Sequence, residues 1–553
     1  MIICYNSLKN MRKKNHAFLL VFLISSLTVA GCSPLQPKGQ KPKPERGSKV
    51  KNVIMVIGDG MGPQQLGLLL TYAKQAPHSV IKNRTTAFDR MMQEGAVMGL
   101  SMTHAANVLV TGSAASGTQL ASGTAAGLKM IGSDKDGNPT VTILEQAEKL
   151  GKSTGLISDT MITHATPAAF AAHQPYRSLE NAIAVDMLNS GADVMLSGGL
   201  NNWIPQEAND SNSAVHNELI QITDGAVKIT SKRKDSRNLL LEAKKKGYTL
   251  AFTKEQMTKA NGNVLGLFAS SGMDNGIKAT RTKNAAQRTM PTLKEMTAKG
   301  IELLAKNEKG FFLMIEAGQI DWASHGNDTG TLLHELLKLN ETLEYVLDWA
   351  ADRDDTLLVV TADHETGGFG FSYSANDLPE PVDLPGKLFK ERKYQPGLNF
   401  GNPEVLDRLY KQALSYGEIF GQFDKLPQKE QTPAKLAELV RRNTAFQITE
   451  KQAARILETE ENPYYVQGHK KLGLKTVPKI DVNAAFFVPN KNGARQNLLA
   501  IEVATQQQVV WATGTHTATP VLVFAKGPGK DAFGQVMHHT ELGQYAINAL
   551  MNK

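Results

Sequence analysis

Short apolar runs that end in turn residues recur along this chain, and they constrain its fold more than any other feature. Runs of this kind are typical of strands that are buried on both faces of a parallel sheet. Stretches with helical periodicity, such as residues 144–150 and 332–350, lie between them. The alternation predicts an α/β domain with a mostly parallel central sheet flanked by helices. The predicted strands span residues 53–57, 154–157, 194–196, 311–315, 357–361 and 521–524.

One polar region departs from this alternation. Residues from about 372 to 500 are predicted to be mainly helical. Thr432 and Pro433 suit a helix cap followed by the first helical position, and residues 449–452 form a capping-box pattern. Because strand-like sequence resumes at Val521, we expect an insertion into the sheet domain and not a separate domain in series. This segment is called the insertion below.

The start of the chain resembles a bacterial lipoprotein signal. Basic residues 12–14 precede an apolar run over residues 17–27, which is too short to cross a bilayer, since a spanning helix needs about 20 residues. The sequence Val-Ala-Gly-Cys follows and ends at Cys32. We therefore expect a signal peptide over residues 1–31, a lipidated Cys32, and a Pro- and Lys-rich flexible linker that ends at residue 51. Met1 and Met11 both remain open as the true start.

This leader predicts a location in the cell envelope. The chain would be anchored to the membrane through Cys32 and would face the periplasm; Ser33, in place of an aspartate after the cysteine, favours the outer membrane. Cys4 lies in the segment that would be removed, so no disulfide within the mature chain is expected. The net charge of +8 comes from residues 1–51. Residues 52–553 carry a slightly negative net charge, so no nucleic-acid-binding surface is expected.

Carboxylates and histidines follow several of the predicted strands. Asp59 stands in a glycine-rich turn directly after the first strand. Asp321 and His325 are four residues apart, which places both on one face of a helix at metal-ligand spacing. Asp363 and His364 directly follow another strand, and this pair of ligand types suits zinc. The remaining candidates are Glu316, at the end of the strand over residues 311–315, and His516, in a small-residue loop.

Each candidate alone has a plainer interpretation. Asp59 suits a helix cap or turn, Asp321 with His325 suits a solvated helix pair, and a lone histidine such as His516 is more often a satisfied surface or core residue. Together, however, the ends of several strands carry ligand side chains. This arrangement predicts a multi-metal centre assembled at one edge of the sheet.

The order of these motifs resembles the alkaline phosphatase family. The resemblance is carried by VIMVIGDGMG, IEAGQIDWASHGND, TADHETGG and GTHTATP, and it covers nearly all of residues 50–550 apart from the insertion. It implies a catalytic domain over residues 52–553 that hydrolyses phosphate monoesters through a phosphoserine intermediate. VTGSAASGT is similar to the family's nucleophile turn, which makes Ser113 the attacking hydroxyl, and Arg177 in HQPYR is similar to the arginine that clamps phosphate.

The resemblance also implies two zinc ions, one magnesium ion and a homodimer. The ligands implied for one zinc are Asp321, His325 and His516. Those implied for the other zinc are Asp59, Asp363 and His364. Those implied for magnesium are Asp59, Thr166 and Glu316, with His164 beside them where some members have aspartate.

Two further positions depart from the best-studied bacterial pattern. Trp322 stands where some members have lysine, and Gly112 stands where an aspartate normally precedes the serine. We therefore expect Arg177 to be less restrained than in relatives, unless another acid substitutes. Two alternatives stay open: a phosphodiesterase or sulfatase-like hydrolase of the same superfamily, and a non-catalytic lipoprotein that captures phosphate or metal. The full ligand set, with Arg177 and Ser113, favours monoesters.

Overall fold

A ten-stranded sheet organises residues 49–553, which are the residues that the computed structural model describes. The strand order is β16-β2-β15-β8-β1-β7-β3-β4-β6-β5. The predicted signal peptide and Cys32 lie outside these residues. Within residues 49–553, every helix is too short or too polar to cross a membrane.

The strands from β8 to β5 in this order are parallel, so the predicted fold class is confirmed. All the predicted strands belong to the sheet: β1 (Asn52–Gly58), β3 (Ser153–Met161), β4 (Val194–Gly198), β7 (Phe311–Ala317), β8 (Thr356–Thr361) and β15 (Val521–Lys526). The four strands of this sheet that the sequence did not predict are β2 (Val97–Met102), β5 (Thr249–Ala251), β6 (Val264–Leu267) and β16 (Val536–His538). β15 runs antiparallel to both of its neighbours, β8 and β2.

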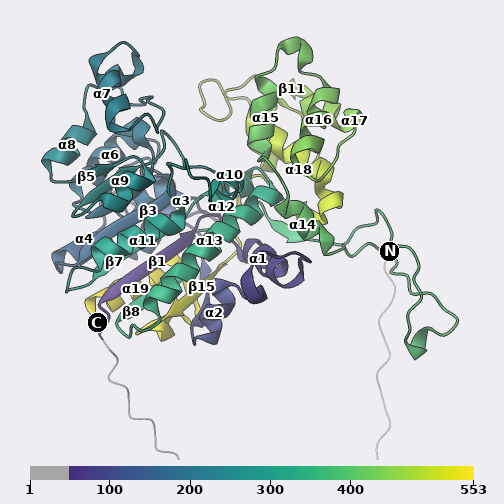
Figure 1. Cartoon of the computed structure of the whole chain (residues 1–553), viewed down its shortest axis with the longest axis horizontal. Coiled ribbons are helices and arrows are strands. Elements are labelled where there is room, and N and C mark those ends of the chain that lie inside the picture. The colour runs from purple at the N-terminus through teal and green to yellow at the C-terminus, as the bar shows by residue number, and fades with distance from the viewer. Residues whose placement is uncertain (1–48) are drawn as a thin grey trace, which may run out of the picture. The chain divides into compact units, whose positions relative to one another are not determined.

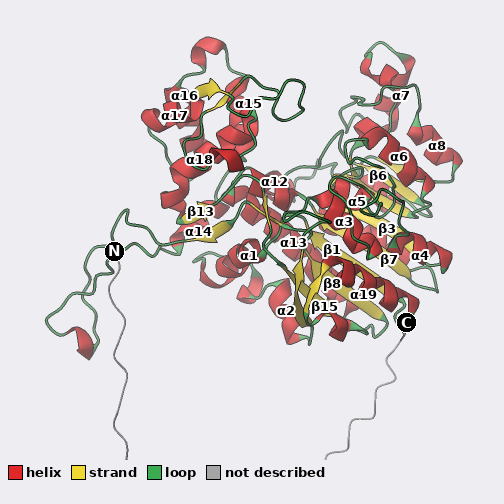
Figure 2. Cartoon of the chain, turned by 180° about the vertical axis from the view of Figure 1, so that it is seen from behind, coloured by secondary structure: helices red, strands yellow, loops and turns green. Residues whose placement is uncertain are grey.

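β1 shows why the sheet is covered on both faces. Its residues are all buried. Ile54 and Val56 pack into one hydrophobic core, and Val53, Met55 and Ile57 pack into the other, because successive side chains of a strand point to opposite faces. Helices α1 (Pro63–Gln75), α2 (Ala87–Gln93), α11 (Leu293–Leu304) and α13 (Thr329–Ala350) lie on the first face (Figure 1). Helices α3 (Ser113–Ser122), α4 (Ile143–Lys149) and α19 (His539–Met551) lie on the second (Figure 2).

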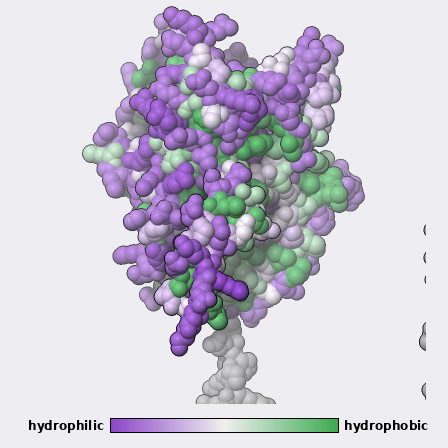
Figure 3. All heavy atoms as spheres, turned by 90° about the vertical axis from the view of Figure 1, so that its right-hand side faces the viewer, coloured by the Kyte–Doolittle hydropathy of each residue, from purple (hydrophilic) through white to green (hydrophobic). Residues whose placement is uncertain are grey.

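The insertion is mainly helical, as predicted. It contains α14 (Glu404–Tyr410), α15 (Tyr416–Asp424), α16 (Pro433–Asn443), α17 (Glu450–Leu457) and the antiparallel pair β11 (Thr459–Glu461) and β12 (Thr476–Pro478). Thr432 caps α16 with proline at the first position, and Thr449 forms a capping box with Gln452. The next helix, α18 (Lys491–Gln507), continues past residue 500. Figure 3 shows that this side of the molecule is mostly hydrophilic, with scattered hydrophobic patches.

Two short strands hold the ends of the insertion together. β10 (Phe369–Phe371) precedes the insertion and pairs antiparallel with β13 (Val509–Trp511), which follows α18. The chain therefore leaves and re-enters the sheet domain at one place.

The register of the central strands brings their carboxyl ends to one edge. Gly58 of β1 lies opposite Ala317 of β7, and Ser158 of β3 lies opposite Glu316. On the other side of β1, Ile57 lies opposite Thr361 of β8. The residues that directly follow β1 and β8 therefore meet beside the end of β7, at the edge where α/β proteins usually place their active sites.

Candidate active site

Asp59 lies at the centre of the predicted site. It follows β1 directly and is fully buried. Its carboxylate lies 3.6 Å from Nε2 of His364 and 3.9 Å from Nδ1 of His164, and it accepts a hydrogen bond of 3.4 Å from the Thr166 hydroxyl. The next residue, Gly60, has a φ of +74°, and a Cβ there would lie 2.7 Å from the Cα of Asp321. Only glycine allows this turn to approach the neighbouring helix so closely.

Three groups of acidic and histidine side chains surround this residue. In each group, one ligand atom from every member lies within 4.8 Å of the others. The groups are Asp321 with His364 and His516, Asp59 with Asp363 and His364, and Asp59 with His164 and Glu316. The predicted ligands therefore converge from elements that are far apart in the sequence.

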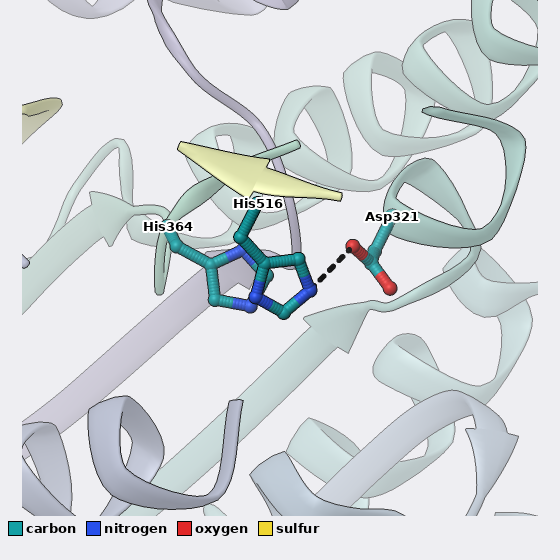
Figure 4. Close-up of side chains that lie close together, drawn as sticks. All are labelled: Asp321, His364 and His516. Carbon is teal, nitrogen blue, oxygen red and sulfur yellow. Dashed lines mark ion pairs between the residues drawn. The ribbon is translucent and has the colours of Figure 1, made fainter. Parts of the chain in front are cut away.

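The first group joins a helix to a short strand. Asp321 lies on α12 (Gln319–His325), and His516 lies on β14 (His516–Thr517). Figure 4 shows the carboxylate of Asp321 facing the His516 ring; Oδ1 lies 3.7 Å from Nε2. His325 belongs to the same cluster, because its Nε2 lies 3.4 Å from Oδ2 of Asp321 and 3.1 Å from Nε2 of His516. The rings of His364 and His516 stack with centroids 3.7 Å apart.

Glu316 anchors the other end of the cluster. It lies in β7 and is fully buried. The hydroxyls of Ser158 and Thr160 both donate to its Oε2, the second at 3.0 Å. Its Oε1 faces Nδ1 of His164 at 3.5 Å. Burial alone would raise the pKa of Glu316, but His164 and the two hydroxyls lower it, so this carboxylate is held ionised.

Several buried polar atoms of the cluster lack a hydrogen-bond partner. Within residues 49–553, no hydrogen bond reaches Oδ1 of Asp59, Oε1 of Glu316, Oδ2 of Asp363 or Nδ1 of His164. Buried polar atoms without partners are rare in folded proteins, since each costs free energy. Carboxylate oxygens and imidazole nitrogens are ligands for zinc, and carboxylate and hydroxyl oxygens suit magnesium. The residues present therefore fit divalent cations.

The electrostatics of the cluster agree with this fit. Burial and repulsion from Asp363, Asp321 and Glu316 raise the pKa of Asp59 well above its ordinary value. Burial and repulsion from Asp321 raise the pKa of Asp363 to about 7. Burial lowers the pKa of His516 to about 4. The protein alone thus disfavours the charge of Asp59 and Asp363 and keeps the His516 imidazole neutral, and a bound cation would reverse the penalty on these two carboxylates.

Ser113 and Arg177 lie beside the ligand cluster. Ser113 is the first residue of α3 and is buried. Its Oγ lies 3.3 Å from Nε2 of His364 and accepts a hydrogen bond of 3.4 Å from Nη1 of Arg177. Nη2 of Arg177 donates to Nε2 of His164 at 2.9 Å. The structure therefore gathers both predicted catalytic residues and all the predicted metal ligands at one edge of the sheet.

Some residues that contact the site were not predicted from the sequence. Ser158 and Thr160 alternate along β3, so both reach the same face and the same carboxylate. The hydroxyl of Thr366 donates to Oδ1 of Asp321 at 2.6 Å. The fully buried His539 lies with Nε2 2.8 Å from the carbonyl oxygen of Asp363. Alternating hydroxyls at the end of a buried strand were the one sequence signal available for these contacts.

The insertion supports His325. The side chain of Asn497 on α18 donates to the carbonyl oxygen of His325 at 2.8 Å and to Asn327 at 2.6 Å. The carbonyl oxygen of Phe486 accepts from the Thr513 hydroxyl. Gly514, the next residue, accepts at its carbonyl oxygen from Nδ1 of His325 at 2.7 Å. Such outer contacts orient a ligand ring and fix its tautomer.

The fold and the site define the class: an α/β protein with a candidate multi-metal centre and a serine at the carboxyl edge of its sheet. The family model described as alkaline phosphatase matches residues 50–552. The chain therefore belongs to the alkaline phosphatase family. The predicted family and the predicted enzyme class, a phosphatase, are confirmed.

Known proteins resemble the chain over almost its whole length. Alkaline phosphatase 3 of Bacillus subtilis is 30% identical over 556 residues, which cover 98% of each chain. Alkaline phosphatase 4 of the same organism is 29% identical over 540 residues, 96% of each chain. The crystal structure of Thermus thermophilus alkaline phosphatase matches with a TM-score of 0.67 and 24% identity, covering 94% of this chain and 96% of that one. A cold-active alkaline phosphatase from Shewanella matches with a TM-score of 0.62 and 26% identity, covering 90% and 99%.

Proposed function

We propose that this chain hydrolyses phosphate monoesters through a phosphoserine intermediate on Ser113, with two zinc ions and one magnesium ion. The observation that carries the proposal is the position of Ser113 Oγ, which lies between Arg177 and the ligand His364. One zinc would be held by Asp321, His325 and His516. The other would be held by Asp59, Asp363 and His364. Magnesium would be held by Asp59, Thr166 and Glu316.

The cations would supply positive charge to the site. Bound at these residues, they would neutralise the carboxylate cluster and stabilise the attacking and leaving oxygens of an in-line displacement. The chain itself positions the attacking hydroxyl. Ser113 stands at the start of a ten-residue helix, where backbone N–H groups and the helix dipole favour an anionic group.

The reaction then has two displacements. In the first, Ser113 Oγ forms a bond to phosphorus as the bond to the leaving oxygen breaks, and the alcohol departs with a proton. In the second, water attacks the phosphoserine, phosphate leaves, and the Ser113 hydroxyl is restored. Two in-line steps give net retention at phosphorus.

Arg177 would bind the phosphoryl oxygens throughout. Its planar guanidinium can offer two parallel N–H donors to two oxygens. In the structure the same nitrogens donate to Ser113 and His164. Phosphate must therefore replace these contacts, and the replacement sets part of the cost of binding.

Trapping of the intermediate tests this proposal. The enzyme, saturated with zinc and magnesium, is quenched in acid during turnover of an aryl phosphate monoester, and its peptides are analysed by mass spectrometry. We expect phosphate on Ser113, and we expect Ser113→Ala to lose several orders of magnitude in turnover while its fold and metal content persist. Ser122→Ala, on the same helix, is the matched control and should keep its activity. Near-normal turnover of Ser113→Ala would refute the proposal.

Substrate comparison tests the alternatives. The same preparation is offered an aryl phosphate monoester, a phosphate diester and an aryl sulfate. Preference for the monoester supports the proposal. Preference for the diester or sulfate would support the second hydrolase class, and binding without any hydrolysis would support a non-catalytic lipoprotein.

The location of the chain is a separate proposal. The leader sequence supports a cell-envelope protein that is anchored through a lipidated Cys32 and faces the periplasm, with the outer membrane favoured. A homodimer is implied by the family resemblance and stays a prediction, which light scattering of the purified protein would check.

A further inference from the structure

A strained lysine lies next to the phosphate-clamping arginine. The backbone N–H of Arg177 donates to the carbonyl oxygen of Lys129 at 2.8 Å. Lys129 is exposed and has a φ of 65°, a left-handed conformation that residues with a Cβ rarely adopt. Strained residues of this kind cluster at functional sites. The pairing places the backbone of Lys129 directly beside that of Arg177.

Two further lysines lie in a loop of the insertion. Lys470 and Lys471 lie in the loop that joins β11 to β12. In Figures 1 and 2, the loop beside β11 projects from the insertion toward the side that carries α6 (Glu180–Asn189) and α7 (Ala214–Ile222). Arg177 lies three residues before Glu180, the first residue of α6. The loop therefore extends toward the side of the sheet domain that carries α6, the helix that follows Arg177.

Hydrogen bonds within this loop fix its shape. The buried Asn462 donates from its side chain to the carbonyl oxygens of Leu472 at 3.3 Å and Leu474 at 2.8 Å. Nδ1 of His469 accepts from the backbone N–H groups of Lys471 at 3.2 Å and Leu472 at 3.0 Å. The tip that carries the two lysines is thus held in one conformation.

The positive charges of Lys471, Lys129 and Arg177 lie near one another. Lys471 is exposed but lies close enough to Arg177, Lys129 and Asp321 to interact with all three charges. Partial desolvation and repulsion from Arg177 and Lys129 lower the pKa of Lys471. Within the part of the chain that the structure describes, no ion pair joins Lys129, Lys470 or Lys471 to an acidic residue. Apart from Asp321, a predicted metal ligand, the charges around Lys471 are all positive. Their mutual repulsion raises the free energy of the folded state, and a bound anion would relieve this cost.

We propose that Lys129, Lys470 and Lys471 form a second anion-binding subsite beside Arg177, which favours phosphate monoesters whose leaving group carries a second anionic group. The inference rests on the proposed function. In-line attack by the buried Ser113 directs the leaving oxygen away from the serine, and these exposed lysines lie on the solvent side of the site. A second phosphate or carboxylate on the leaving group would reach them.

A matched pair of substrates tests the subsite. We compare kcat/KM for an α,ω-alkanediol bisphosphate and for the alkyl monophosphate of equal chain length, using the metal-saturated enzyme at low ionic strength. The wild-type protein should show the higher kcat/KM for the bisphosphate, even after this value is halved because the substrate carries two phosphates. The double variant Lys129→Ala/Lys471→Ala should lower this preference about fivefold or more, and added salt should lower it in the wild type as well. Lys475→Ala, an exposed lysine of the same loop, is the control and should keep the preference.

The outcomes separate this inference from the proposed function. A double variant that keeps the bisphosphate preference, or a wild-type protein without one, would overturn the subsite. An equal loss on both substrates would also overturn it, because the lysines would then act on the reacting phosphate. If the wild-type protein hydrolyses neither ester, the proposed function itself fails. Melting temperatures of all variants establish that the fold is retained.

Discussion

Nη2 of Arg177 donates a hydrogen bond to Nε2 of His164 at 2.9 Å. Arginine has only donors, so Nε2 must offer its lone pair, and the proton of a neutral His164 then stands on Nδ1. Nδ1 faces Oε1 of Glu316 at 3.5 Å and Oδ2 of Asp59 at 3.9 Å. In this tautomer His164 is a donor toward the predicted magnesium ligands and not itself a ligand. Departure of Arg177 toward bound phosphate would free His164 to change its tautomer.

The insertion should contribute to metal retention through Asn497. Asn497→Ala removes the two hydrogen bonds that hold the end of α12, so His325 loses part of its restraint. We expect zinc affinity to fall about 10- to 100-fold, the usual cost of losing an outer contact. Competition with a chromophoric chelator measures this directly. Thr505→Ala, at an exposed position of the same helix, is the control. Unchanged zinc affinity in Asn497→Ala would show that the insertion does not support the centre.

A buried histidine outside the candidate metal cluster should make the fold sensitive to acid. His334 lies on α13, with Nε2 2.9 Å from the carbonyl oxygen of Tyr410 and Nδ1 3.1 Å from the Thr280 hydroxyl. Burial lowers the pKa of His334 from 6.5 to about 4. Between these values the unfolded chain binds a proton that the folded protein does not, so the free energy of unfolding falls as the pH falls through this range. The loss is on the order of 3 kcal/mol.

His334→Gln tests that prediction, because glutamine keeps a donor and an acceptor but does not titrate in this range. Denaturant unfolding is compared on both sides of the ordinary histidine pKa. The variant should lose less stability on acidification than the wild-type protein, and His216→Gln on α7 should behave like the wild type. An equally steep loss in His334→Gln would assign the acid sensitivity to other groups.

Membrane association should depend on one of the two cysteines. Cys32→Ser removes the thioether that would carry the lipid, so the protein should leave the membrane fraction and lose the mass of the acyl groups. Cys4→Ser, in the segment that would be removed, should leave both unchanged. Fractionation and intact mass spectrometry measure the two effects. Unaltered fractionation and mass of Cys32→Ser would contradict the predicted lipoprotein signal.

Much of the fold could be predicted because its strands are buried on both faces. β1 and β8 are uninterrupted apolar runs, and such runs have few alternatives in a chain with helical segments between them. β5 has three residues, of which the first is exposed, and β2 is only partly buried. Neither strand contains an apolar run long enough to distinguish it from a loop in the sequence.

The meeting of the candidate ligand side chains at one edge of the sheet could also be predicted, because each follows a strand or lies in a distinctive motif. The residues that position these side chains could not be predicted. Asn497 and the carbonyl oxygen of His325 that it contacts are 172 positions apart, and asparagine on a helix carries no signal of such a contact. The same holds for the lysines of the proposed subsite, since only the folded insertion brings Lys471 near Arg177.

Gly112 offers the sharpest test of how Arg177 is held. In the structure its φ is −140°, an extended value that any residue adopts, and α3 has no side-chain cap at this position. A Cβ there would meet only the His516 ring, at 3.8 Å, which is an ordinary contact. Gly112→Asp should therefore fold without strain, and its carboxylate should cap α3 and compete with His164 for the guanidinium.

Gly112→Asp should make the enzyme bind phosphate more tightly and turn over more slowly. A carboxylate that holds Arg177 ready would remove part of the ordering cost of binding, roughly 1 kcal/mol, or about fivefold in the inhibition constant of phosphate. Tighter product binding also slows release, which often limits turnover. Gly112→Asn adds a similar side chain without the charge and should change neither constant as much. Metal content and melting temperature are measured first. If correctly metallated Gly112→Asp shows the phosphate inhibition of the wild-type protein, Ser113 and His164 already hold Arg177 as well as a carboxylate would, and the argument from the missing carboxylate fails.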